Sequence, residues 1–140
     1  MRRALELAAR GRTSPNPMVG AVVVKQGKVV GEGYHSRAGH PHAEVEALRQ
    51  AGNKARSADL YVNLEPCCHF GRTPPCTDAI IQAGIKRVFV GMKDPNKQVG
   101  GKGLRALKAQ GIVIVSGILK KECMKLNESF VKVMQTGMPF

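Results

Sequence analysis

The order of apolar runs and helix-forming stretches constrains the fold of this chain more than any other feature. From residue 60 onward, short β-branched and apolar runs alternate with segments of helical periodicity. The predicted strands cover residues 60–64, 88–90 and 112–115, and the predicted helices cover residues 77–83, a stretch ending near 110, and 120–133. Such alternation predicts parallel strands joined by helices that cover both faces of the sheet.

The part of the chain before residue 60 predicts a different local pairing. Its expected elements are a helix over residues 2–10, strands over 19–25 and 29–34, and a helix over 42–51. The turn Gln26-Gly27-Lys28 between the two strands predicts an antiparallel hairpin. Gly52 is suited to end the second helix. We therefore predict a three-layer α/β/α fold, in which helices cover both faces of a mixed five-stranded sheet.

The size and composition indicate one domain that spans residues 1–140. Hydrophobic residues make up 43% of the 140 residues, which is typical of a globular chain. No run approaches the roughly 18 apolar residues of a membrane span, and the N-terminal segment lacks the apolar core of a signal peptide. We expect a cytoplasmic protein with no membrane partner.

Two short segments carry the residues with the most distinctive chemistry. They are His42-Ala43-Glu44 and the stretch from Pro66 to Cys76, which holds Cys67 and Cys76. One imidazole and two thiolates can hold three corners of a tetrahedral zinc ion and leave the fourth for water, as catalytic zinc sites do. A His-x-Glu segment followed by a Pro-Cys…Cys pair is typical of zinc-dependent deaminases of nucleobase-like rings. We predict one zinc ion per chain.

A closed structural zinc site is the main alternative for these residues. His40, Cys68 or His69 would then supply the fourth ligand. The adjacent Cys67-Cys68 pair makes Cys68 the weakest of these candidates, and a structural site would not need Glu44. In the catalytic interpretation, zinc brings the pKa of its bound water toward about 7. Glu44 takes that proton and later returns it to the departing amine.

The charge of the chain bears on its partners. The formal net charge is +12, which suits a phosphorylated metabolite, RNA or simply a solvated surface. Trp is absent and aromatic residues are 4% of the chain, which disfavours base-stacking platforms. Nucleic acid is therefore the less favoured partner. A tRNA adenosine deaminase, another polynucleotide deaminase and a non-catalytic zinc module that binds RNA remain the alternatives.

The spacing of the cysteine ligands separates this chain from most base deaminases. Eight residues lie between Cys67 and Cys76, whereas the usual pattern is Cys-x-x-Cys. With this spacing, the chain resembles the deaminase domain of the bifunctional riboflavin-biosynthesis deaminase/reductase family, which is cytidine-deaminase-like in fold. The resemblance covers essentially the whole chain and rests on the following segments: Ser14 to Val24, His42-Ala43-Glu44, Leu64 to Cys67, Gly71 to Cys76, Asp94-Pro95-Asn96 and Gly101-Lys102-Gly103.

The resemblance implies a substrate and roles for the matching residues. The substrate is 2,5-diamino-6-(5-phosphoribosylamino)pyrimidin-4-one, whose C2 amine is replaced by oxygen with release of ammonia. The residues implied to hold the pyrimidine are Asn16, His35 and Glu44, and those implied to contact the ribose phosphate are His69, Arg72, Asp94 and Asn96. Side-chain chemistry independently supports a phosphate contact for Arg72, because a guanidinium offers forked donors suited to phosphate.

The chain also departs from the pattern of that family. Family members usually continue into a reductase domain that uses NADPH, and no nicotinamide-binding segment is found in these 140 residues. We therefore expect a reductase domain in cis or in trans, and NADPH only where that domain is present. Lys97 stands where the family usually has proline. The sequence leaves a homo-oligomer open.

Overall fold

The fold is built on one mixed sheet of five strands in the order β2-β1-β3-β4-β5. This computed structural model describes residues 1–13, 16–68, 74–96 and 100–136. The strands are β1 (Gly20–Lys25), β2 (Lys28–Tyr34), β3 (Asp59–Leu64), β4 (Arg87–Met92) and β5 (Val113–Ser116). β1 pairs antiparallel with both β2 and β3, whereas β3, β4 and β5 run parallel. The predicted hairpin and the predicted parallel half of the sheet are both confirmed.

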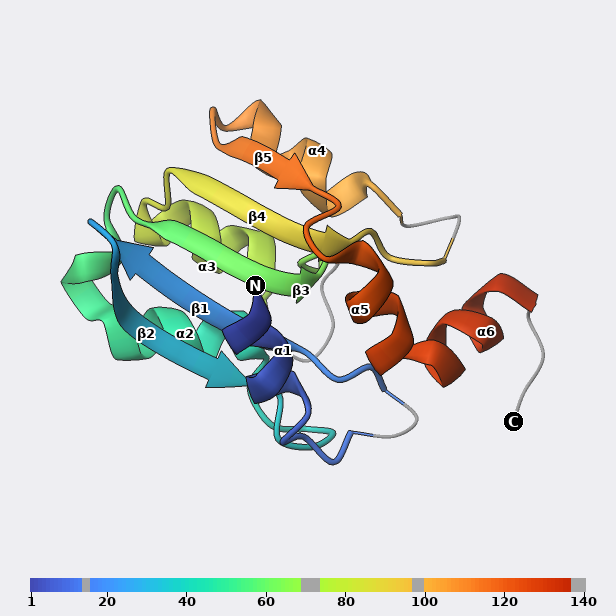
Figure 1. The fold of residues 1–140 in the computed structure, drawn as a ribbon. Helices are drawn as coiled ribbons and strands as arrows, with labels where there is room; N and C mark the ends of the chain where they lie inside the picture. Colours follow the sequence, from blue (N-terminus) through green and yellow to red (C-terminus); the bar gives the residue numbers. More distant parts are fainter. Residues whose placement is uncertain (14–15, 69–73, 97–99, 137–140) are drawn as a thin grey trace.

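Helices cover both faces of this sheet, as the predicted three-layer arrangement requires (Figure 1). The helices are α1 (Arg2–Ala8), α2 (Ala43–Ala51), the 3-10 turn η1 (Gly52–Ala55), α3 (Cys76–Ala83), α4 (Lys102–Ala109), α5 (Lys120–Leu126) and α6 (Glu128–Thr136). α2, α3 and α4 form one layer, while α1 and α5 lie against the opposite face. No helix in the described part of the chain is long and apolar enough to cross a membrane.

The main core lies between the sheet and the layer of α2, α3 and α4. The alternate strand residues that face this layer, such as Val23, Leu60 and Val90, are fully buried. Glycine lets α2 approach β2 closely, because a Cβ at Gly33 would lie 2.5 Å from the carbonyl oxygen of Ala43. The first turn of α2 therefore rests directly on the sheet, and this fixes the place of the residues that begin the helix.

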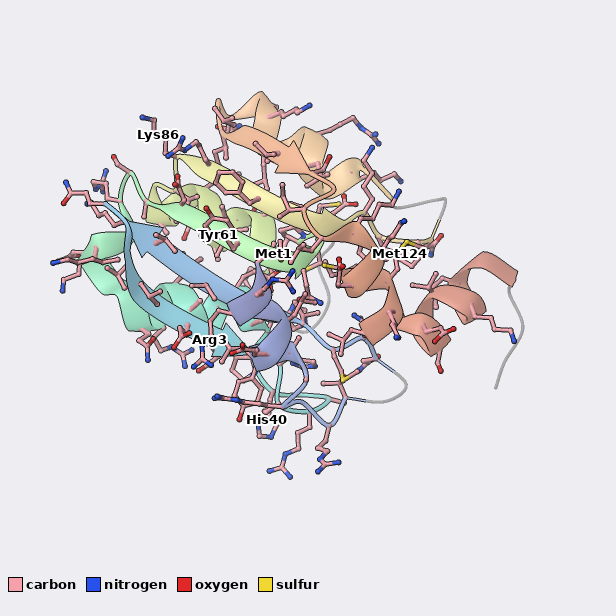
Figure 2. All side chains as sticks on the ribbon, in the orientation of Figure 1. Met1, Arg3, His40, Tyr61, Lys86 and Met124 are labelled. Carbon is pink, nitrogen blue, oxygen red and sulfur yellow. The ribbon has the colours of Figure 1, made fainter. Side chains whose placement is uncertain are left out.

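A second apolar cluster lies at the carboxyl ends of β3 and β4. It consists of Leu64, Met92, Cys123 and Val131, the last two from α5 and α6. Met1 packs against this cluster and lies on the face of the sheet that α1 and α5 cover (Figure 2). Ligands of α/β sheets bind beyond the carboxyl ends of the strands, so this cluster lies next to the expected site.

The C-terminal region differs from the sequence prediction. We predicted one helix over residues 120–133, whereas the structure has α5 and α6 with a break at Asn127. Asn127 has φ −108° and ψ 32°, and its amide is buried. The side chain hydrogen-bonds to the backbone of Met18, 109 residues away, so the break follows from a tertiary contact that helical periodicity does not report. The other predicted elements agree to within about two residues, the usual uncertainty of helix ends.

Candidate active site

Three side chains that could bind a metal meet at the ends of three elements. His42 is the N-cap of α2, Cys76 is the first residue of α3, and Cys67 follows β3 by three residues. Their ligand atoms all lie within 4.8 Å of one another. The His42 Nδ1 atom is 3.1 Å from the Cys76 sulfur and 3.8 Å from the Cys67 sulfur. The three predicted ligands therefore form one group.

The dimensions and charges of this group fit a zinc ion. Nitrogen and sulfur ligands placed about 2.0–2.3 Å from a tetrahedral zinc lie roughly 3.5 Å apart, close to the separations found here. The pKa of Cys67 is lowered to about 4, chiefly because Cys76 hydrogen-bonds to its thiolate, and the pKa of Cys76 is raised by the same contact. A bound dication would favour the thiolate at both positions.

The local fold holds the two cysteine sulfurs in place. The backbone N–H of Cys76 donates to the Cys67 sulfur over 3.3 Å, and the N–H of Thr77 donates to the Cys67 carbonyl over 3.1 Å. Cys67 therefore lies at the N-terminus of α3, where backbone N–H groups stabilise a thiolate. Neither Cys68 nor His40 belongs to the metal-capable group formed by the described residues, while His69 lies outside the described ranges.

Glu44 lies in the first turn of α2, beside the metal-capable group. Its side chain is only 3% exposed. Burial raises the pKa of this carboxyl to about 7, with the nearby Cys67 thiolate adding to the effect. A carboxyl with a pKa near neutrality gains and loses a proton readily, which is the property that general acid–base catalysis needs.

His35 follows β2 and lies against His42, with ring centroids 5.3 Å apart in an edge-to-face arrangement. Its Nδ1 atom is 3.2 Å from the Pro41 carbonyl oxygen. Because a carbonyl can only accept, the proton of the ring lies on Nδ1. Burial lowers the pKa of His35, which keeps the ring neutral and leaves Nε2 as a hydrogen-bond acceptor.

A cavity of about 290 Å³ brings most of the predicted site residues together. Its lining residues are Asn16, Pro17, Val19, His35, His42, Glu44, Leu64, Glu65, Cys67, Asp94 and Phe130. Asn96 is not among them, although its N–H donates to the Asp94 carboxylate over 2.9 Å. His69 and Arg72 fall outside the described residues, so their predicted phosphate contacts remain predictions.

Glu65 is a site residue to which the sequence analysis gave no role. Its carboxylate is 6% exposed and accepts four backbone N–H groups. Oε1 accepts from Asp94 and Gly101 at 3.0 and 2.8 Å. Oε2 accepts from Gly103 and Leu104 at 2.9 and 3.3 Å. One carboxylate thus ties the segment that carries Asp94, and the N-terminus of α4, to the strand end beside the metal ligands.

Two buried amides hold the segment that carries the lining residues Pro17 and Val19. Asn127 accepts from the N–H of Met18 at 2.7 Å and donates to the Met18 carbonyl at 2.8 Å. Asn63 donates to that same carbonyl at 3.0 Å and accepts from the N–H of Gly20 at 2.8 Å. The segment that follows Asn16 is therefore fixed by side chains from β3 and from the break between α5 and α6.

Comparison with known proteins identifies the family of this site. The family profile described as the cytidine and deoxycytidylate deaminase zinc-binding region matches residues 1–92. The chain belongs to this family. Diaminohydroxyphosphoribosylamino-pyrimidine deaminase of Buchnera aphidicola subsp. Schizaphis graminum is 51% identical over 141 residues, which cover 99% of this chain and 96% of that protein. The chain is thus a riboflavin-biosynthesis deaminase homologue, in agreement with the resemblance found in the sequence.

Two longer relatives match the chain over part of their length. Riboflavin biosynthesis protein RibD of Escherichia coli K12 is 58% identical over 142 residues, which cover all of this chain and 39% of that protein. The solved diaminohydroxyphosphoribosylaminopyrimidine deaminase/5-amino-6-(5-phosphoribosylamino)uracil reductase of Thermotoga maritima has a TM-score of 0.93 and 48% identity, over 100% of this chain and 41% of that one. The chain spans about two fifths of the length of these relatives. The structural match, together with the family profile, confirms the predicted cytidine-deaminase-like fold.

Proposed function

We propose that this chain catalyses the hydrolytic deamination of 2,5-diamino-6-(5-phosphoribosylamino)pyrimidin-4-one at C2, an early step of riboflavin biosynthesis. The products are 5-amino-6-(5-phosphoribosylamino)uracil and ammonia. The observation that carries this proposal is the metal-capable group of His42, Cys67 and Cys76, since two of its members, His42 and Cys67, line the same cavity as the buried Glu44 carboxyl. We propose that these three ligands hold a single zinc ion.

Glu44 carries the protons of the reaction. A zinc ion held by the three ligands supplies the Lewis acidity that makes water a nucleophile near neutral pH. The Glu44 carboxylate accepts a proton from the attacking water and then donates it to the amine nitrogen that leaves from C2. Because burial raises its pKa to about 7, this carboxyl serves as base and as acid in one turnover.

The other lining residues orient the pyrimidine and the ribose phosphate. The Nε2 of His35, the acceptor nitrogen of the neutral ring, accepts a hydrogen bond from a ring or exocyclic N–H of the substrate. The Asn16 amide offers both a donor and an acceptor at the rim. The Asp94 carboxylate, with Asn96 beside it, suits the hydroxyl groups of the ribose. His69 and Arg72 are assigned to the phosphate.

The setting in which the domain works is part of the same proposal. The longer relatives suggest a reductase partner in cis or in trans that consumes the product and uses NADPH. The four cysteines are free thiols, and the ligand pair must stay reduced to bind metal, which favours the cytoplasm. A homo-oligomer remains compatible with the proposal.

The test measures ammonia release by the zinc-loaded protein from the phosphoribosylaminopyrimidine and from a tRNA anticodon stem. Glu44→Gln serves as the inactive control. We expect ammonia from the pyrimidine alone. Release from the RNA alone would replace the proposal with a polynucleotide deaminase, for which the +12 charge is the argument. No release from either substrate by a fully zinc-loaded protein would leave a non-catalytic zinc module.

A further inference from the structure

We propose that α6 forms a substrate-contacting wall of the active site, in which Phe130 packs against the pyrimidine ring and determines specificity for flat heterocycles. This inference rests on the proposed deaminase function. The family profile ends at residue 92, so Phe130 lies outside the matched region. We also propose that Asn127 is the positioning residue that fixes this wall.

The cavity composition supports a ring contact for Phe130. Its apolar lining residues are Pro17, Val19, Leu64 and Phe130. Phe130 is the one carbocyclic aromatic side chain among the described residues that line the cavity, and it is only half-buried, so part of its surface is open to a ligand. A flat aminopyrimidine gains most from an aromatic face or edge, whereas a ribose phosphate gains most from hydrogen-bond donors and charges.

Two contacts on α6 hold Phe130 at the cavity. Val131, the next residue, is buried in the cluster with Leu64, whose side chain also lines the cavity. Asn127 opens the first turn of α6, because its carbonyl accepts from the N–H of Val131 at 2.9 Å. Its amide meanwhile makes two hydrogen bonds to Met18. α6 is therefore tied both to the end of β3 and to the rim that carries Asn16.

This arrangement explains why the last helix breaks. An unbroken helix over residues 120–133 would keep residue 127 in helical geometry, whereas Asn127 has left it to reach Met18. The break changes the direction of the chain between α5 and α6. In Figure 1, α6 extends beyond the end of the sheet at which β3 ends. The scarcity of aromatic residues disfavours base-stacking platforms, but the tertiary structure places one aromatic side chain, Phe130, in the cavity lining.

The chain contains no tryptophan, so Phe130→Trp introduces a single fluorescent reporter at the wall. The zinc-loaded variant is titrated with 2,5,6-triaminopyrimidin-4-one, which is the ring without its sugar, and with ribose 5-phosphate. Met134→Trp is the matched control, because Met134 is 36% exposed, lies one helical turn away and does not line the cavity. We expect the ring compound to change the emission of Phe130→Trp and to leave that of Met134→Trp unchanged.

Kinetics of Phe130→Ala provide the second readout. We expect KM for the full substrate to rise roughly 5- to 150-fold, the range for loss of a base–aromatic stack, with zinc content unchanged and kcat affected less. Wild-type KM in Phe130→Ala, or emission that responds only to ribose 5-phosphate, would overturn the inference. A different result is that wild type releases no ammonia from the pyrimidine while the emission of Phe130→Trp still responds to the ring compound. That result would refute the proposed function and retain the contact between Phe130 and the ring.

Discussion

Residues 1–92 and residues 93–140 contribute different things to one cavity. The first region, which the family profile matches, holds the three metal-capable side chains and Glu44. The second region adds Asp94 and Phe130 to the lining. In the first region the functional side chains lie at helix starts and just beyond the end of β3. In the second region they depend on hydrogen bonds to the first. We infer that the first region carries the chemistry and part of the substrate site, and that the second completes the substrate site with Asp94 and Phe130.

Glu65 and Asn127 show how the two regions are joined. Glu65 belongs to the first region and holds the second with four hydrogen bonds from one buried carboxylate. Asn127 belongs to the second and holds the first with a neutral amide. A buried carboxylate needs several donors to offset its desolvation, whereas an amide is satisfied by a complementary donor and acceptor.

The largest effect is expected from Cys76→Ser. A hydroxyl is a poor zinc ligand compared with a thiolate, so the variant should lose most of its zinc and its deaminase activity should fall to background. Metal analysis after dialysis measures the zinc. Cys68→Ser is the matched control and should keep both zinc and activity. Full zinc occupancy with full activity in Cys76→Ser would remove Cys76 from the ligand set.

Glu44→Gln should keep the zinc and the fold but lower kcat by about 10²–10⁴-fold. Glutamine has the shape of the carboxylate and cannot carry a proton. Steady-state kinetics and zinc content measure the two parts of this prediction. Turnover within about 10-fold of wild type would show that another group moves the proton, and the first region would then lose its general acid–base residue.

Arg72→Ala tests whether the first region also binds the phosphate of the substrate. If Arg72 binds the 5′-phosphate, its loss should lower kcat/KM on the phosphorylated substrate about 10- to 150-fold, because a charge-assisted contact is removed. The dephosphorylated substrate is the control and should be turned over almost as by wild type. An equal loss on both substrates would assign Arg72 to support of the loop instead.

Glu65→Gln should destabilise the junction between the two regions. The amide nitrogen of glutamine faces two backbone N–H donors that the carboxylate now satisfies, so we expect the free energy of unfolding to fall by about 1.5–3 kcal/mol. We also expect KM to rise while zinc is retained, because the segment bearing Asp94 loosens. Denaturant unfolding measures the first effect, and the exposed Glu122→Gln is the control. An unchanged KM would separate this junction from substrate binding.

Asn127→Ala should have the smallest effect of the series. It removes two hydrogen bonds to Met18, and Asn63 still binds the Met18 carbonyl, so we expect a loss of about 1–3 kcal/mol in the free energy of unfolding. KM should rise and kcat should change little, since Glu44 and the metal ligands are untouched. Asn53→Ala, at an exposed position, is the stability control. A fall in kcat at constant KM would contradict the proposed division of roles.

Much of the fold could be predicted because its signals are local. The hairpin at Gln26-Gly27-Lys28 and the strand–helix alternation after residue 60 depend on turn residues and periodicity within short windows. Gly84 ends α3 in the left-handed conformation that a glycine allows, with φ 78°. The single helix predicted over 120–133 was wrong because periodicity continues across Asn127, while a contact with Met18 decides the backbone there.

The sequence by itself determined which side chains were predicted to bind the metal and to move the proton, because ligand chemistry resides in residue types at characteristic spacings. His42, Cys67 and Cys76 were predicted as a set, and the fold brings them within 4.8 Å. Only the tertiary structure decided what surrounds them. The bonds of Glu65 to the start of α4 and of Asn127 to Met18 join residues 36 to 109 positions apart. Such partners depend on the packing of the whole chain, and no local pattern reports them.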